Sequence, residues 1–369
     1  MRVVLAPDKF KGSLDAGEVV AALAAGVARV RPEVGVVRMP VADGGDGTVG
    51  AFVAAGWEAV RVGAVGPTGM PVEAVYAVRG GTAVVELAGV VGLAKLPGGR
   101  AEPMGSSTYG LGMVIGDALD RGVRDIVLGV GGSASTDGGA GMLQALGLRI
   151  LDAAGCELPR GGAALARADR IDRSGLHPAL RETSIVLASD VDNPLLGTRG
   201  AAAIFGPQKG ADPEQCAILD AALANWARVV DPEVAERPGA GAAGGTGFAA
   251  MALLGAVERP GIEVVLELID FAAEVRGADL VVTGEGSFDE QTLHGKAPMG
   301  VCAAARAAGV PVVAVAGRCL LDESRWRAAG FADCYALSEL EPDPRRSMVG
   351  AGPLLEQLGA RIAREHLRS

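Results

Sequence analysis

Charged and hydroxyl side chains of this chain gather in short loops, each of which directly follows an apolar run. Carboxylates and cations occur there in similar numbers, a mixture that suits phosphoryl transfer. In that chemistry Mg²⁺ bridges polyphosphate oxygens, lysines neutralise the transferring group and one carboxylate accepts a hydroxyl proton. The loops contribute Asp8, Lys9, Lys11 and Ser13; Asp43 and Asp46; Ser133, Ser135 and Asp137; Ser189, Asp190 and Asp192; Thr283, Glu285, Asp289, His294 and Lys296; and Arg318.

The most distinctive of these loops is residues 131–139, GGSASTDGG, which we call the Gly-rich loop. The apolar run from Ile126 to Val130 predicts a buried strand before it, and Met142 and Leu143 begin a helical pattern after it. Glycines let backbone N–H groups converge on one point, and a helix N-terminus adds partial positive charge, so a phosphate is the favoured ligand. A purely structural tight turn is the alternative, because the loop matches neither GxGxxG nor GxxxxGK[ST].

Each polar residue also has a structural alternative when it is taken alone. Two lysines in a polar loop, such as Lys9 and Lys11, are usually solvated. Asp137 and Asp190 stand where helix caps are common, and residues 192–194, Asp-Asn-Pro, are typical of a turn. The functional hypothesis therefore depends on co-occurrence. Ligands of open parallel sheets bind outside the carboxyl ends of the strands, where all these loops are expected.

The elements that must position the loops predict an α/β fold of two domains. Both chain ends alternate strand-like and helical patterns, whereas the region after Val60 has short alternating runs with a Gly80-Gly81 turn that predicts an antiparallel hairpin. We predict a Rossmann/flavodoxin-like parallel-sheet domain built from residues 1–62 and 277–369. Residues 63–276 are predicted to be an inserted mixed-sheet α/β domain that carries the Gly-rich loop.

Length and composition agree with this organisation. A chain of 369 residues is long for one core, so we expect two domains and a cleft. A hydrophobic content of 49 % with 21 % charged residues indicates a globular protein. The formal charge of -10 makes nucleic acid a poor partner and favours a small molecule. Five single cysteines without a CxxC motif argue against a disulfide framework and a zinc site.

Membrane association is not expected. The chain begins with a strand-like pattern and has no charged-then-apolar leader, which predicts a cytoplasmic protein. Residues 238–257 are uncharged, but their first half consists mostly of glycine and small residues, a poor membrane helix. We expect a flexible Gly loop that leads into a buried helix there.

The polar loops, in their order along the chain, resemble the signature blocks of the type I glycerate kinase family. The matching blocks are LAPDKFKGSL, PVADGGDGT, GVGGSASTDGGAGM, ASDVDNPLLG with GAAAIFGPQKGA, GAGAAGGTG, and GADLVVTGEGSFDEQTLHGKAPMGV. The resemblance implies a kinase that uses ATP and Mg²⁺ to phosphorylate D-glycerate, with a two-domain α/β fold. Ser287 is a departure, because the family usually has Arg or Lys at that position.

Roles for single side chains are our own assignments. We predict Asp190 as the catalytic base or an Mg²⁺ ligand and Asp137 as a second metal ligand, with Lys9 and Lys11 neutralising negative charge. The predicted nucleotide site comprises Gly131, Gly132, Ser133, Ser135, Asp137, Gly138, Glu285 and Lys296. The predicted glycerate contacts are Lys9, Ser13, Asp43, Asp289 and His294.

Two other classes of protein stay open at this point. A non-catalytic sensor of a phosphorylated metabolite would use the cationic loops, although it would not need so many carboxylates. An α/β oxidoreductase acting on a sugar acid would lack its dinucleotide fingerprint here. For the kinase we predict 2-phosphoglycerate as the product, with 3-phosphoglycerate as the alternative, and we expect a homodimer as the assembly.

Overall fold

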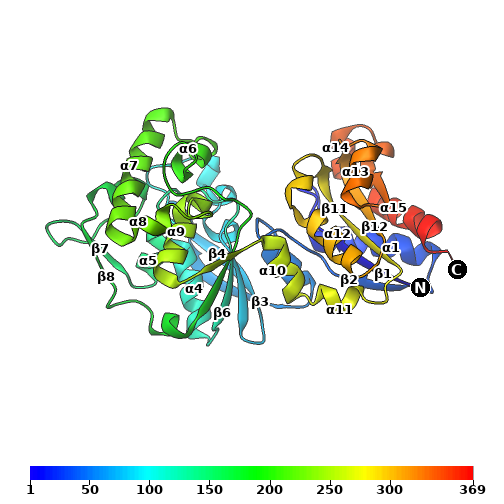
Figure 1. The fold of residues 1–369 in the computed structure, drawn as a ribbon, viewed down its shortest axis with the longest axis horizontal. Coiled ribbons are helices and arrows are strands. Elements are labelled where there is room, and N and C mark those ends of the chain that lie inside the picture. Colours follow the sequence, from blue (N-terminus) through cyan, green and yellow to red (C-terminus); the bar gives the residue numbers. More distant parts are fainter. Residues whose placement is uncertain (369) are drawn as a thin grey trace. The chain divides into compact units, whose positions relative to one another are not determined.

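The structure, a computed structural model, describes residues 1–368. The chain divides into two compact units, both visible in Figure 1. The first unit comprises residues 1–43, 50–57 and the chain from residue 261 onward, and the second comprises residues 44–49 and 58–260. Each unit has its own sheet. The predicted fold class, a parallel-sheet domain built from both chain ends and an inserted mixed-sheet domain, is confirmed.

The sheet of the first unit has five parallel strands in the order β13-β12-β11-β1-β2. Its central strands β1 and β11 come from opposite ends of the chain, and Val4 of β1 pairs with Val281 of β11. Residues 3–7 of β1 and the first three residues of β11 are continuous apolar runs, as expected where helices cover both faces of a sheet, whereas the rest of β11, TGEGSF, is largely polar and glycine. The strands are β1 (Arg2–Pro7), β2 (Gly35–Arg38), β11 (Leu280–Phe288), β12 (Val312–Cys319) and β13 (Asp333–Ala336).

Helices α1 and α15 pack side by side against this sheet (Figure 1). The start of α1 is set by a capping box, in which Asp15 accepts a hydrogen bond from the Glu18 amide at 2.8 Å and Glu18 accepts one from the Asp15 amide at 2.9 Å. The capping box therefore fixes Asp15 as the last residue of the polar loop after β1. The longer helices of the unit are α1 (Ala16–Val30), α10 (Gly261–Leu268), α12 (Ala297–Ala307) and α15 (Ala351–His366); the shorter ones are α11 (Phe271–Val275), α13 (Glu323–Ala329) and α14 (Pro344–Val349). Helix α2 (Thr48–Ala54) begins in the second unit and continues into the first.

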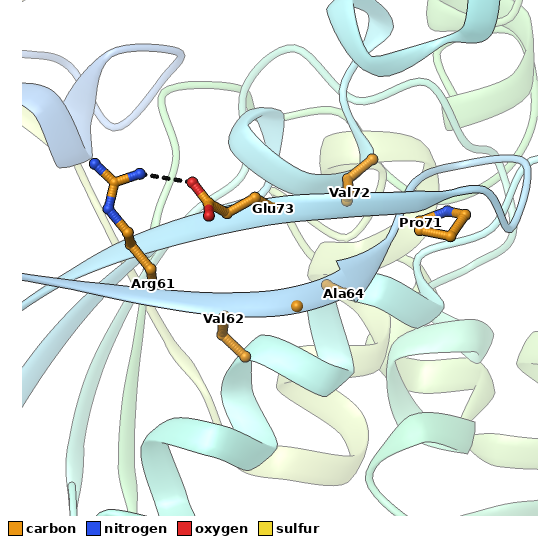
Figure 2. A pocket seen from close by; sticks show the side chains of 7 residues that line it. Arg61, Val62, Ala64, Pro71, Val72 and Glu73 are labelled. Atoms are coloured by element: carbon orange, nitrogen blue, oxygen red, sulfur yellow. Dashed lines mark hydrogen bonds and ion pairs between the residues drawn. The ribbon is translucent and has the colours of Figure 1, made fainter.

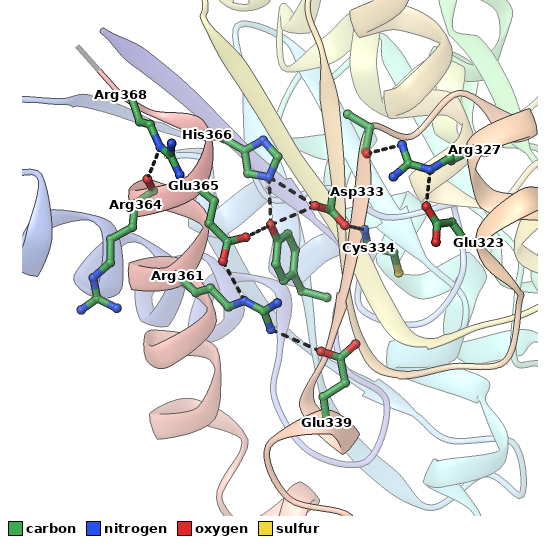
Figure 3. Close-up of polar contacts among 12 residues, drawn as sticks. Glu323, Arg327, Asp333, Cys334, Glu339, Arg361, Arg364, Glu365, His366 and Arg368 are labelled. Carbon is green, nitrogen blue, oxygen red and sulfur yellow. Dashed lines mark hydrogen bonds and ion pairs between the residues drawn. The ribbon is translucent and has the colours of Figure 1, made fainter.

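A hydrogen-bonded cluster around Tyr335 joins β13 to the end of α15. Figure 3 shows Asp333, Glu365 and His366 of this cluster close together. The Tyr335 hydroxyl donates to Glu365 at 2.5 Å and lies 2.9 Å from His366 Nε2 and 3.1 Å from Asp333 Oδ2. Burial and these carboxylates raise the pKa of the Tyr335 phenol. Arg361 also pairs with Glu365, at 3.1 Å. The cluster holds the C-terminal helix on the sheet.

The sheet of the second unit has six strands in the order β10-β9-β6-β5-β4-β3. Strands β3, β4 and β5 are antiparallel, and Gly80 and Gly81 make the predicted two-residue turn between β4 and β5, both with positive φ. Strands β5, β6, β9 and β10 are parallel. The strands are β3 (Glu58–Val65), β4 (Pro71–Arg79), β5 (Thr82–Glu86), β6 (Asp125–Gly129), β9 (Ser184–Ala188) and β10 (Val257–Arg259); β7 (Arg149–Leu151) and β8 (Arg170–Asp172) form a separate ribbon.

One large core fills the second unit, and the aromatic side chains of Tyr76, Trp226 and Phe248 are fully buried in it. Its helices are α3 (Ala88–Val91), α4 (Tyr109–Asp120), α5 (Ala140–Ala145), α6 (Ala201–Phe205), α7 (Pro213–Val230), α8 (Pro232–Ala235) and α9 (Ala242–Leu254). The hairpin of β3 and β4 carries a shallow pocket of about 360 Å³ (Figure 2). No predicted site residue lines it, and an Arg61–Glu73 ion pair of 2.6 Å lies beside it.

The unit boundaries differ from the predicted ones at both changes of domain. Strand β3 begins at Glu58, so residues 58–62 belong to the second unit. Helices α10 and α11 pack with α12, so residues 261–276 belong to the first unit. An apolar helical pattern shows that a helix has a buried face but not which core covers it, and the sequence was therefore a poor guide to these boundaries.

The Gly segment at the start of α9 is packed rather than free, contrary to the expected flexible loop. Gly244 and Gly245 have φ values of 69° and 90°. A Cβ on Gly244 would lie 2.1 Å from the Ser135 carbonyl oxygen, so this backbone is in close contact with the Gly-rich loop. Within residues 1–368, no helix is both long and apolar enough to cross a membrane.

Candidate active site

Three neighbouring parallel strands of the second unit, β5, β6 and β9, end at the same edge of its sheet. Their register pairs Glu86 with Gly129, and Gly129 with Ala188. The Gly-rich loop follows β6, and Asp190 lies two residues beyond the end of β9. Within this unit the structure therefore places the predicted phosphate loop and the predicted base on adjacent strand ends.

Residues 44–49, from the ADGGDGT motif, pack onto the same edge of the sheet. A Cβ on Gly129 would lie 2.4 Å from the Gly44 carbonyl oxygen, and one on Gly131 would lie 2.7 Å from Gly45 Cα. No side chain fits at either contact, which explains why glycine occupies positions 129 and 131. Two Gly-rich segments that are far apart in the sequence thus lie backbone to backbone.

Glu86 holds this segment in place, a role that our reading of the sequence missed. The Glu86 side chain is 5 % exposed and accepts hydrogen bonds from the amides of Gly47, at 3.1 Å, and Val49, at 3.0 Å. The sequence feature that could have identified Glu86 is that its carboxylate ends the apolar run TAVVE. A buried carboxylate that ends a strand requires donors from elsewhere in the fold.

Asp137 is the structural centre of the Gly-rich loop. It is 0 % exposed, and its carboxylate accepts from the Thr108 amide at 2.8 Å and hydroxyl at 2.9 Å, and from the amides of Gly139 at 3.3 Å and Gly141 at 3.2 Å. Burial raises the pKa of Asp137 despite these donors. Both carboxylate oxygens are thus engaged inside the protein, and these contacts give no support to the predicted metal-ligand role.

Lys209 is the second residue that our sequence reasoning missed. It ends a short 3₁₀ turn, Pro207–Lys209, and is only 2 % exposed. Its ammonium donates to the Ser133 hydroxyl at 2.7 Å and to the Ser135 carbonyl at 2.5 Å. Burial lowers the pKa of Lys209 to about 7, although the Asp137 carboxylate opposes this shift. The sequence feature that could have identified Lys209 is that it is the single lysine inside the small-residue block GAAAIFGPQKGA.

Several polar groups of the Gly-rich loop are left without protein partners. Among residues 1–368, the amides of Gly131, Gly132, Ser133, Ser135 and Thr136 donate to no backbone or side-chain acceptor. Within the same range, the buried hydroxyls of Ser135 and Thr136 have no hydrogen-bond partner either. Buried polar groups normally find partners. Unpaired N–H and O–H donors in a Gly-rich loop are what an anion site requires.

The far end of the Gly-rich loop is fixed by other segments of the second unit. The Gly138 amide donates to the Gly244 carbonyl at 2.9 Å, and the Trp226 indole donates to the Gly138 carbonyl at 3.1 Å. A Cβ on Gly138 would lie 2.6 Å from the Trp226 ring. The predicted contact residue Gly138 thus serves the packing of the loop.

The loop after β9 is more open. Asp190 is exposed, and Asp192 forms a 3.4 Å ion pair with Arg199. The Asn193 side chain donates to the Arg199 carbonyl at 2.8 Å, and the backbone turn of this loop lies at residues 198–199 rather than at the predicted Asp-Asn-Pro position. Asp190 lies at the start of this loop and is exposed to solvent.

Carboxylates also gather at the strand ends of the first unit. Asp8 follows β1, and its amide donates to the Gly284 carbonyl at 2.8 Å on the neighbouring strand β11. Burial, together with the nearby carboxylates of Asp43 and Glu285, raises the pKa of Asp8 to about 8. Burial raises the pKa of Glu285 as well. The predicted residues Asp43 and Glu285 therefore belong to one electrostatic cluster around Asp8.

Glu285 and Asp289 have local partners in the same unit. Glu285 accepts from the Thr292 hydroxyl at 2.5 Å and from the Lys296 ammonium at 3.4 Å. Asp289 accepts from the Ser287 hydroxyl at 3.0 Å. The contact between Lys296 and Glu285 joins the two predicted nucleotide residues directly.

The remaining predicted residues of the first unit differ in exposure. Lys11 and His294 are exposed, and Lys9 is half-buried. The Ser13 hydroxyl donates to the Met348 carbonyl at 2.7 Å. Lys11 and His294 are thus open to a ligand, whereas the Ser13 hydroxyl already donates to the main chain.

Arg318 supplies a cation beside position 287. Its Nε donates to the Ser287 hydroxyl at 3.2 Å, and the two residues are partners in the register of β11 and β12. The Arg318 guanidinium therefore lies next to residue 287, although residue 287 itself is a serine.

Taken unit by unit, these features are typical of an α/β enzyme that handles phosphorylated ligands at strand ends. Comparison with known proteins identifies the family. The profile of the glycerate kinase family matches residues 3–367. The chain therefore belongs to the glycerate kinase family and is a kinase, which removes the sensor and the oxidoreductase from consideration.

Individual relatives agree with this assignment. A glycerate kinase of Bacillus subtilis is 44 % identical over 86 % of this chain and 85 % of its own length. A glycerate 2-kinase of Escherichia coli is also 44 % identical, with the same coverage of each chain. A crystal structure from Salmonella typhimurium LT2, provisionally described as a glycerate kinase 2, superimposes with a TM-score of 0.86 at 39 % identity and covers 99 % of this chain and 97 % of that one.

Proposed function

We propose that this kinase transfers the γ-phosphoryl group of ATP to the 2-hydroxyl of D-glycerate and so forms 2-phosphoglycerate. The observation that carries the proposal is the Gly-rich loop, whose unpaired amides lie on the strand end next to that of Asp190. Support for the 2-hydroxyl comes from the similarity to the Escherichia coli glycerate 2-kinase.

In this proposal, the amides of Gly131, Gly132 and Ser133 bind phosphate oxygens of ATP. Backbone N–H groups are already oriented and need no reorganisation as charge moves during transfer. Asp190 accepts the proton of the attacking hydroxyl, a role that its exposure permits. For the first unit, taken by itself, the proposal keeps Lys11 as a cation for the glycerate carboxylate or a phosphate, and keeps Glu285 and Lys296 as nucleotide contacts.

As the alternative to its role as the base, Asp190 is the residue that fits Mg²⁺, and Asp137 does not fit it. Mg²⁺ prefers oxygen ligands and usually takes one or two carboxylates together with substrate phosphates. Asp190 is exposed, whereas the Asp137 oxygens accept four internal hydrogen bonds. When bound, the ion would supply charge neutralisation of the phosphates.

Phosphorus NMR of the product tests both the activity and the position of transfer. The purified protein would be incubated with D-glycerate, ATP and Mg²⁺, and the spectrum recorded without proton decoupling. Phosphate on the 2-hydroxyl neighbours one proton and gives a doublet, whereas phosphate on the 3-hydroxyl neighbours a CH₂ group and gives a triplet. A triplet would shift the proposal to 3-phosphoglycerate, and the absence of a new phosphate ester would contradict it.

A further inference from the structure

Two buried ionisable side chains, Lys209 and Asp137, hold the Gly-rich loop. The Lys209 ammonium binds the first half through the Ser133 hydroxyl and the Ser135 carbonyl. The Asp137 carboxylate binds the end of the loop through the amide of Gly139 and the following helix α5 through the amide of Gly141. The Asp137 carboxylate opposes the lowering of the Lys209 pKa by burial.

The contact with Lys209 fixes the direction of a peptide group. A trans peptide is planar, so the C=O of one residue and the N–H of the next point in opposite directions. Because the Ser135 carbonyl faces Lys209, the Thr136 N–H points away from it. In the same way, the Gly132 carbonyl accepts from the Leu93 amide at 3.0 Å, which turns the Ser133 N–H outward.

The N–H groups of Ser133 and Thr136 both lack an acceptor within the described part of the chain. The Ser135 carbonyl is also enclosed on a second side, because a Cβ on Gly244 would lie 2.1 Å from it. The direction of the Ser135 carbonyl is therefore set by the Lys209 ammonium and by the close contact with Gly244. If the cation were lost, the carbonyl could turn toward the ligand, where its oxygen would repel a phosphate.

We propose that Lys209 is a positioning residue of the ATP phosphate site: its buried ammonium fixes the Ser135 carbonyl and thereby keeps the Thr136 amide directed at phosphate. Lys209 is 2 % exposed and acts through the loop rather than by touching the ligand. This inference rests on the proposed function, in which the Gly-rich loop binds the phosphates of ATP. It adds a residue from a distant segment, Pro207–Lys209, to that site.

Calorimetric binding of a non-hydrolysable ATP analogue tests the inference with Lys209→Met. Losing one well-directed N–H donor to a charged phosphate should weaken binding of the analogue roughly 10- to 100-fold. The affinity for D-glycerate should stay within about twofold of the parent, since the main-chain donors concerned serve phosphate. Lys95→Met is the matched control, because Lys95 is half-buried and has no assigned role, and it should bind the analogue as the parent does.

A second measurement uses only the parent protein, and it tests the inference even if Lys209→Met does not fold. In the parent protein, the analogue should slow amide hydrogen exchange in peptides that cover residues 131–137 and leave the ribbon of β7 and β8 unchanged. Equal binding by the parent and a folded Lys209→Met would overturn the inference, as would analogue binding without slowed exchange at 131–137. If the parent bound no analogue at all, the proposed function itself would fail.

Discussion

Replacing Asp8 by Asn should stabilise the first unit, and the gain should grow with pH. Burial and the carboxylates of Asp43 and Glu285 raise the pKa of Asp8 from 3.8 to about 8. Below about pH 4 the carboxyl is protonated in both the folded and the unfolded chain. Between these two values the folded chain holds a proton that the unfolded chain has released, so the parent loses stability as pH rises. Asn keeps the shape and cannot ionise.

The size of the effect follows from proton linkage. Each pH unit between the two pKa values changes the free energy of unfolding by at most about 1.4 kcal/mol, which gives a ceiling of roughly 4 kcal/mol between pH 5 and pH 8. Asp8 is half-buried, and solvent screens part of the repulsion. We therefore expect the stability difference between Asp8→Asn and the parent to grow by roughly 1–3 kcal/mol over this range and to level off above pH 8.

Native-state hydrogen exchange is the suitable assay because the chain has two units, and a single melting temperature would mix them. Peptides from β1 and β11 report on the first unit. Peptides from β6 in the second unit are the internal reference and should exchange equally in both proteins. Measurements in EDTA at pH 5, 6, 7 and 8 give the difference at each pH. A difference that is constant with pH, or that shrinks as pH rises, would refute the electrostatic reasoning.

Three further predictions concern the proposed active site and one concerns assembly. Asp190→Asn should melt near the parent temperature but lower kcat on the order of 10²–10⁴-fold; parental kcat in a stable variant would remove Asp190 from the mechanism. Excess EDTA should abolish ADP formation with D-glycerate, and added Mg²⁺ should restore it; full activity in EDTA would exclude a metal requirement. Asp137→Asn removes the partner charge of Lys209 and should lower the free energy of unfolding by roughly 3–5 kcal/mol in urea titrations, whereas a change below about 1 kcal/mol would show that the loop does not depend on this carboxylate. Light scattering of the purified protein should give twice the chain mass if the predicted homodimer forms, and a single chain mass would contradict it.

The strand-to-loop pattern, the fold class and the family could be predicted from the sequence. These features are local: an apolar run that ends in a polar or Gly-rich loop has the same meaning wherever it occurs, and the order of the loops is written along the chain. The positions of the Gly-rich loop and of Asp190 after β6 and β9 follow from such runs. The Gly80-Gly81 turn is local as well, because its two positive φ values require glycine.

The tertiary structure alone decided which polar residues are exposed and which are buried to support the fold. Asp137 and Asp190 are both carboxylates in strand-end loops, yet Asp137 is fully buried among four donors and Asp190 is exposed. Lys209 and Glu86 gained their roles from contacts with loops far away in the sequence. Burial and hydrogen-bond partners depend on every segment that packs against a residue. A single segment of sequence therefore cannot specify them, however clear its own pattern is.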